Sequence, residues 1–197
     1  MATMGATDMA LATLLTWECY MRASELLALR PKDVLYKGDK RMPLTEVTGG
    51  VLIRSSKTGA NNFVAVRLPA VMVMLSRQAK LARGAKRKKI FAFSAERWRK
   101  TLQAAARFLK LEPHYVLHSL RHGGALTDFL EGVPLLRIKL RGRWKSDQSL
   151  KTYLQAGRAI LMEIRLPKRV RVLGSLCKGD PLKLMLVAQA MSSYHSA

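Results

Sequence analysis

The sequence predicts an α+β fold that is mostly α-helical and includes one small three-stranded antiparallel sheet. Apolar residues recur at helical spacing through most of the chain, and three short β-rich runs lie close together between residues 34 and 67. The 197 residues, of which 49% are hydrophobic, are enough for one compact domain with a small appendage.

The first half of the chain is expected to hold two short helices, the sheet and a longer helix. Residues 8–29 show helical spacing that is interrupted near Arg22 and stopped by Pro31, which predicts two helices that meet near Arg22. Strands are expected at residues 34–36, 51–54 and 63–67, with turns at residues 37–40 and 58–62. A helix then follows from Pro69 to about Ala82.

The second half of the chain is expected to be helical. A basic loop at residues 85–89 precedes an amphipathic helix that has Ser94 as its N-cap and ends near Leu109. Pro134 and Ser146 are further start signals. The remaining helices are expected at residues 118–130, 134–141, 146–155 and 182–191.

Positive charge dominates the composition. The chain has 35 Lys and Arg against 13 Asp and Glu, and its net charge is +22. The excess is uneven, with +1 over residues 1–56, +13 over residues 57–110 and +8 over residues 111–197. A chain this basic repels itself unless a polyanion neutralises it, so nucleic acid is the expected partner. An anionic membrane is a weaker alternative, since the basic residues do not line one face of a long amphipathic helix.

The basic residues of the middle segment are expected to grip the backbone of a DNA duplex, although the stretch Lys86–Lys89 also fits a nuclear-import signal. The expected DNA-binding residues are Arg83, Lys86, Arg87, Lys88, Lys89, Arg97, Arg99 and Lys100.

Cysteine usage and hydropathy restrict the class of protein further. Cys19 and Cys177 lie 158 positions apart, which excludes a disulfide scaffold and favours a reduced intracellular compartment. No apolar run reaches the ~18–20 residues of a membrane span, and no basic segment precedes the first apolar stretch as in a signal peptide. We therefore expect an intracellular, DNA-associated protein, in a prokaryotic cytoplasm or a eukaryotic nucleus.

Two short motifs in the first third could act on a phosphate. Arg22 opens a short helix with Glu25 one turn later, so Glu25 could hold the guanidinium against an anion, although a surface ion pair is the simpler alternative. Lys57 lies in a turn between two expected strands and could donate a proton to a leaving oxygen. A solvated turn lysine is its alternative.

Histidines on the expected helix at residues 118–130 form the third motif. His118 and Arg121 share one face of that helix, and an imidazole beside a guanidinium suits a phosphoryl centre. His114, His118 and His122 also recur at four-residue intervals, so a zinc site is a weaker alternative. No carboxylate or thiolate joins them at ligand spacing.

Trp144 and Tyr153 form the fourth motif. Taken alone, Trp144 could be a core anchor and Tyr153 an ordinary half-buried helix residue. Their spacing is more informative, because Trp144 follows His118 by twenty-six residues and Tyr153 follows Trp144 by nine.

In this order and spacing the four motifs resemble the catalytic domain of the tyrosine recombinases, the phage-integrase family, over residues 8–158. The family's Gly-x-Arg-x-x-Glu motif resembles residues 20–25, although Tyr20 stands where the family usually has glycine. Its β-turn lysine resembles Lys57, and its His-x-x-Arg box resembles His118 and Arg121. The resemblance implies the DNA breaking-rejoining fold of that domain.

The resemblance also implies a reaction. In the family a tyrosine, here Tyr153, attacks a DNA phosphate and forms a 3′-phosphotyrosyl bond, with no metal, ATP or other cofactor. The resemblance implies that His118 accepts the phenol proton, that Arg22 and Arg121 clamp the phosphate, and that Trp144 adds a donor and Lys57 a proton. The expected activity is that of a site-specific recombinase or integrase of a mobile element. A type IB topoisomerase-like nicking-closing enzyme and a non-catalytic DNA-binding protein are the alternatives.

The family resemblance bears on domains and partners as well. We expect residues 1–160 to form the catalytic domain and residues 161–197 a basic segment with an apolar helix. That helix would dock on a second copy of the chain or pack within its own chain. The family's N-terminal clamp domain is expected to be absent, and double-stranded DNA and a dimer or tetramer on DNA are the expected partners.

Overall fold

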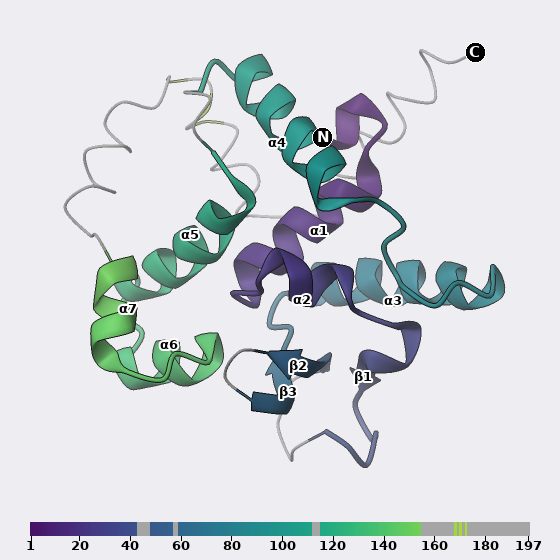
Figure 1. The fold of residues 1–197 in the computed structure, drawn as a ribbon, viewed down its shortest axis with the longest axis horizontal. Helices are drawn as coiled ribbons and strands as arrows, with labels where there is room; N and C mark the ends of the chain where they lie inside the picture. The colour runs from purple at the N-terminus through teal and green to yellow at the C-terminus, as the bar shows by residue number, and fades with distance from the viewer. Residues whose placement is uncertain are drawn as a thin grey trace.

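Helices make up most of the structure, which is a computed structural model, and a small sheet lies to one side of them (Figure 1). The structure describes residues 1–42, 48–56, 59–111 and 115–154, with positions 168, 170 and 172. Within these ranges it does not describe five side chains, those of Thr3, Ser55, Ser56, Thr152 and Tyr153.

The described α-helices are α1 (Thr7–Glu18), α2 (Ala23–Leu27), α3 (Pro69–Gly84), α4 (Ala95–Phe108), α5 (Leu117–Leu130), α6 (Leu135–Gly142) and α7 (Asp147–Tyr153). The strands are β1 (Val34–Tyr36), β2 (Gly49–Ser56) and β3 (Gly59–Ala65). Two short 3₁₀ helices, Ala2–Met4 and Pro31–Asp33, were not predicted. The predicted break near Arg22 is confirmed, and Ser94 is the N-cap of α4, its hydroxyl accepting from the backbone N–H of Arg97 (3.1 Å).

Several predicted boundaries differ from the structure, among them both ends of β2, which covers Gly49–Ser56 where residues 51–54 were expected. Residues 59–62, expected as a turn, belong to β3, because Gly59 pairs directly with Ser56. That strand ends at Ala65 rather than at residue 67, since the backbone N–H of Arg67 donates to the carboxylate of Glu18 instead of to the sheet. Helix α7 ends at Tyr153 rather than at residue 155, as Leu154 has left the helical conformation. The helix predicted at residues 182–191 lies outside the described residues.

The sheet is antiparallel in the order β1-β2-β3 and pairs Val51 with both Val34 and Val64. These three valines are buried, and they belong to the main hydrophobic core together with Leu75 of α3 and Trp98 of α4. The sheet therefore lies against the helices through one apolar face, as a half-buried antiparallel sheet should.

A second, smaller core lies under α6 and α7. It consists of Tyr20, Ala125, Ile138, Trp144 and Leu150. Leu150 is fully buried, and an ion pair between Lys139 and Asp147 (2.7 Å) also joins α6 to α7. Tyr20, just after α1, is the member that reaches this core from the N-terminal part of the chain.

Helices α1 and α5 cross at very close range. A Cβ added at Gly124 of α5 would lie 1.9 Å from the carbonyl oxygen of Trp17 in α1, so only glycine fits there. This approach brings the end of α1, and Tyr20 after it, against the helix that carries His118 and Arg121. Within the described ranges, none of the helices combines the length and apolar character that a membrane crossing requires.

The close crossing gives a first testable prediction. Gly124→Ala is expected to destabilise the fold by about 1–3 kcal/mol, because its methyl group must push α1 and α5 apart. Gly84→Ala is the matched control, since a Cβ at Gly84 meets no atom within 4 Å. Thermal unfolding should show a lower midpoint for the first variant only. Equal midpoints would show that the two helices are not packed this tightly.

Candidate active site

Arg22 is held at the start of α2 by Glu25, one turn later. The backbone N–H of Arg22 donates to one carboxylate oxygen of Glu25 (2.8 Å), and its guanidinium donates to the other (2.7 Å). The Arg22 side chain is 24% exposed, whereas that of Glu25 is 3% exposed. The geometry fits the predicted role of Glu25, because its buried carboxylate holds the Arg22 guanidinium while that guanidinium still reaches the surface.

A second guanidinium binds the same carboxylate, and the sequence analysis did not single it out. Arg143 is buried and donates to Glu25 (2.8 Å) and to the backbone carbonyl of Tyr20 (3.2 Å). Its backbone is left-handed (φ 56°) where it ends α6, a conformation unusual for a residue with a side chain.

Burial opposes ionisation of the Glu25 carboxyl. The charge of Arg143 and the hydrogen bonds from Arg22 outweigh that effect and hold the pKa of Glu25 below its usual value. Glu25 is therefore ionised at neutral pH and shared between the two arginines.

Arg121 lies almost wholly inside the protein, at 1% exposure. Its guanidinium donates to the backbone carbonyl of Tyr20 and, at 2.5 Å, to that of Gly142. The indole ring of Trp144 covers it, with the guanidinium carbon 4.4 Å from the ring centroid. Trp144 is thus both the core anchor that the sequence allowed and a neighbour of the site.

His118 stands on the exposed side of the same helix, one turn before Arg121, and its ring meets that of His122 edge to face at 4.7 Å. Partial desolvation lowers the pKa of His118, and the nearby charges of Arg121 and Arg22 lower it further. His118 is consequently neutral at pH 7 and able to accept a proton. The charges of Arg22 and Arg121 therefore act on the His118 ring.

A polar network that includes the buried side chains of Tyr20 and Asp128 lies next to the arginines. The Tyr20 hydroxyl donates to Asp128 of α5, and Arg67 binds both oxygens of Asp128 (2.8 and 3.0 Å). Arg141 of α6 donates to the backbone carbonyls of Glu18 (2.9 Å) and Ala65 (3.0 Å). The sequence analysis missed this network because its members are far apart in the chain and match no short motif.

The side chains of Lys57 and Tyr153, both predicted to be catalytic, lie outside the part of the chain that the structure describes. Lys57 lies outside the described residues, between the ends of β2 and β3. Tyr153 is the last residue of α7, and the structure describes its backbone but not its side chain. Helix α7 packs against α5, which carries His118 and Arg121 (Figure 1). The roles of Lys57 and Tyr153 stay predictions.

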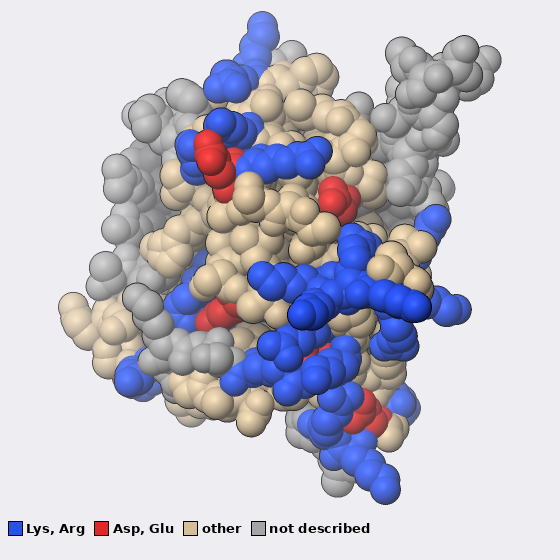
Figure 2. Space-filling model, turned by 45° about the vertical axis from the view of Figure 1, so that its right-hand side comes forward, with Lys and Arg blue, Asp and Glu red and all other residues tan. Residues whose placement is uncertain are grey.

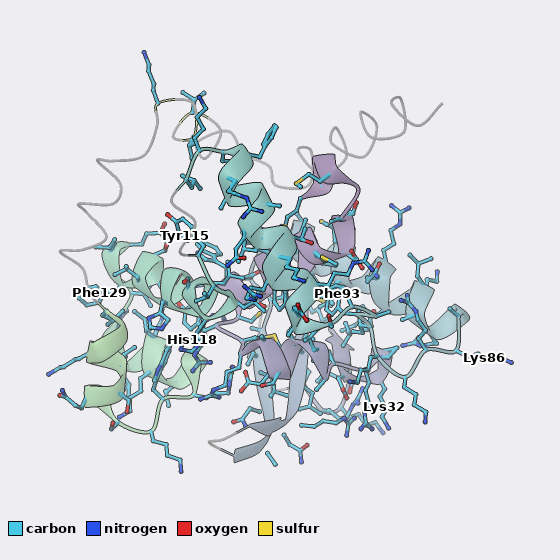
Figure 3. All side chains as sticks on the ribbon, turned by 45° about the horizontal axis from the view of Figure 1, so that its top comes forward. Lys32, Lys86, Phe93, Tyr115, His118 and Phe129 are labelled. Carbon is cyan, nitrogen blue, oxygen red and sulfur yellow. The ribbon has the colours of Figure 1, made fainter. Side chains whose placement is uncertain are left out.

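Lys and Arg side chains gather in a broad band in one region of the surface, whereas Asp and Glu form small isolated patches (Figure 2). Of the eight predicted DNA-binding residues, Arg87 is half-buried and the others are exposed. In Figure 3, Lys86, in the turn after α3, projects at the right-hand edge of the molecule, whereas His118 lies left of the centre. The basic loop therefore lies away from the arginine cluster.

The zinc alternative gains no support from the described ranges, where no three His, Cys, Asp or Glu side chains gather as a metal site requires. His114 lies outside those ranges. The positive charge of Arg22 and Arg121 beside His118 would also repel a metal cation.

The charge of the cluster decides what it can bind. Two guanidinium groups, those of Arg22 and Arg143, bind the one carboxylate of Glu25, and a third, that of Arg121, shares the Tyr20 carbonyl with Arg143. The excess positive charge favours an anion, and planar guanidinium groups match the oxygens of a phosphate.

No family model matches the chain, and no curated protein matches it in sequence. A solved structure does match in fold, that of the XerH site-specific recombinase bound to a palindromic difH substrate in a post-cleavage complex. The TM-score is 0.59 at 19% sequence identity, and the match covers 81% of this chain and 45% of that chain. The chain thus spans less than half the length of the XerH chain. The likeness confirms the predicted fold, which is that of a tyrosine recombinase catalytic domain.

The shared carboxylate gives a second prediction. Glu25→Gln is expected to cost about 3–5 kcal/mol of stability at pH 7, because Arg143 would be left buried without a counter-charge. Since the folded pKa of Glu25 is lowered, its contribution is present above the ordinary value of 4.5 and is lost as the pH falls through the folded pKa. Urea unfolding between pH 7 and pH 3 should show the two proteins converging in acid.

The control for this measurement is Asp39→Asn, which removes a carboxylate from an arginine at the protein surface. Its effect on the free energy of unfolding at pH 7 is expected to be small, because solvent screens that pair. Equal losses for Glu25→Gln and Asp39→Asn would contradict the role of burial.

Proposed function

We propose that the chain breaks and rejoins DNA through a 3′-phosphotyrosyl bond, as a site-specific recombinase of the tyrosine class, with Tyr153 as the nucleophile. The observation that carries the proposal is that one set of contacts links Arg22, Arg121 and Trp144, which are far apart in the sequence: Glu25 joins Arg22 to Arg143, the Tyr20 carbonyl joins Arg143 to Arg121, and Trp144 covers Arg121. His118 lies one turn before Arg121 on α5, and the charges of Arg121 and Arg22 act on its ring. The XerH chain with the same fold is bound to DNA after cleavage, which supports the same class of substrate.

In the proposed reaction the phenol oxygen of Tyr153 attacks a DNA phosphorus atom. A tyrosyl–phosphorus bond forms, the bond to the 5′ oxygen breaks, and a 5′-hydroxyl leaves. One ester replaces another, so no external energy source or cofactor is required. Neutral His118 takes the phenol proton, and Lys57 supplies a proton to the leaving oxygen. A 5′-hydroxyl attacking in reverse rejoins a strand.

The arginines would stabilise the negative charge that develops on the phosphate oxygens. Arg22 has the exposed guanidinium that can donate to those oxygens directly. Arg121 adds positive charge from the buried side, where water screens it little. Preorganised donors of this kind are worth about 10²–10³ in rate each.

The remaining basic residues would hold the duplex outside the reacting phosphate. The eight residues from Arg83 to Lys100 that the sequence predicts for this role are mostly exposed, as backbone contacts need to be. We place the catalytic unit at residues 1–160 and expect it to assemble as a dimer or tetramer on DNA through residues 161–197.

A nicked suicide duplex tests the activity. The unaltered chain is expected to form a covalent protein–DNA adduct, seen as a shifted band after denaturing electrophoresis, and Tyr153→Phe should form none. Tyr36→Phe is the matched control and should form the adduct at the normal rate, because Tyr36 is an exposed residue of β1. DNA binding without an adduct in the unaltered chain would leave only a DNA-binding role. Plasmid relaxation by a monomer without strand exchange would indicate a nicking-closing enzyme instead.

The salt dependence of DNA binding tests the basic loop. Lys88→Gln combined with Lys89→Gln should lower the slope of log Kd against log salt by about two, since each phosphate contact contributes about 0.9. Arg107→Gln combined with Lys110→Gln removes the same charge from exposed positions at the far end of α4 and should leave the slope nearly unchanged. The same slope in both double variants would show that net charge alone governs binding.

A further inference from the structure

Tyr20 occupies a backbone conformation that normally requires glycine. It lies between α1 and α2 with φ 48°, in the left-handed region, and its side chain is fully buried. A side chain in this conformation is strained, so the surrounding structure must hold it there. Arg143 is also left-handed and donates to the Tyr20 carbonyl, so two strained residues are in contact.

The carbonyl oxygen of Tyr20 joins two guanidinium groups of the site. Arg121 and Arg143 both donate to it, the first from α5 and the second from the end of α6. The direction of this carbonyl therefore sets where both guanidinium groups lie. Arg22 follows two residues later, so the same stretch of backbone also places the third.

The side chain of Tyr20 fixes this stretch of backbone. Its hydroxyl donates to Asp128, which Arg67 holds through both carboxylate oxygens. Its ring packs on Trp144 at 6.0 Å between centroids and lies 5.6 Å below the guanidinium carbon of Arg141. Trp144 in turn covers the Arg121 guanidinium, so the Tyr20 ring supports that guanidinium indirectly, through Trp144.

We infer that Tyr20 is a positioning residue of the proposed cleavage reaction and that it acts through Arg121. Its buried hydroxyl and its ring hold the left-handed backbone in place, and the backbone carbonyl binds the Arg121 guanidinium. The inference rests on the proposed function for its effect on rate. In a chain with glycine at position 20, the backbone could reach the same angles, but nothing would anchor the carbonyl to Asp128 and Trp144.

The experiment compares Tyr20→Phe with Tyr20→Gly. The phenylalanine variant keeps the ring and loses the hydroxyl bond to Asp128, whereas the glycine variant relieves the strain and loses both anchors. Adduct formation on the suicide duplex under single-turnover conditions is expected to slow by about tenfold for Tyr20→Phe and by about a hundredfold for Tyr20→Gly. The first effect is smaller than the loss of a whole hydrogen-bond donor at the phosphate, which costs about 10²–10³ in rate, and the second is comparable to it. The Kd for DNA should change by less than about twofold, since phosphate contacts elsewhere carry affinity.

A second readout follows the position of Arg121 without any reaction. Among the described residues, the groups that act on His118 include Arg121 and His122 on its own helix and Arg22 at the start of α2. If Arg121 moves away, its charge no longer favours neutral His118, and the pKa of His118 should rise toward its ordinary value. Nuclear magnetic resonance titration of the His118 ring, assigned with His118→Gln, measures this rise in both Tyr20 variants.

Controls separate positioning from loss of stability. Ile90→Val trims a fully buried side chain of the main core, and Tyr36→Phe removes an exposed hydroxyl; neither should change the cleavage rate or the His118 titration. Normal rate and normal titration in Tyr20→Phe and Tyr20→Gly would overturn the inference. No adduct in the unaltered chain would overturn the proposed function, and the titration would then decide whether Tyr20 positions Arg121.

Discussion

Glu25 accepts hydrogen bonds from the guanidinium groups of Arg22 and Arg143, and the arrangement of the site depends on this sharing. Like charges inside a protein repel strongly because little water screens them. A single ionised carboxylate between the two arginines offsets that repulsion but does not cancel the total positive charge. The cluster is therefore stable when empty and still attracts an anion, which is what a phosphate site requires.

The backbone carries the second part of this arrangement. Tyr20 and Arg143 both adopt the left-handed conformation, and both take part in the arginine cluster. Strain at such positions persists only where packing and hydrogen bonds determine the conformation from several sides. Here the smaller core under α6 and α7 supplies that support, so the small core matters more to the site than its size suggests.

Local patterns in the sequence predicted the elements and the four residues that meet. The spacing of Arg22, His118, Arg121 and Trp144 can be read from the sequence without knowing the fold. Ser94 marks a helix start because its hydroxyl can accept from a backbone N–H of the first turn.

Arg143 could not be separated from the other basic residues between Arg141 and Lys145, because its burial depends on the turn that ends α6. The network of Tyr20, Asp128 and Arg67 joins three distant segments, and the one local signal was an acidic residue on the apolar side of α5. Strand ends were misjudged where Glu18 takes the N–H of Arg67 from the sheet.

The two carbonyl oxygens that receive Arg121 belong to different segments, one before α2 and one at the end of α6. A guanidinium spans them because its nitrogens diverge in a plane, and the indole of Trp144 covers this guanidinium, with the guanidinium carbon 4.4 Å from the ring centroid. Lysine would carry the same charge on a single nitrogen. It could not bridge both carbonyl oxygens and would offer no flat surface to the Trp144 ring. The shape of the side chain thus requires arginine at position 121. An exchange for lysine would conserve the charge but lose the hydrogen bonds that join the segment before α2 to the end of α6.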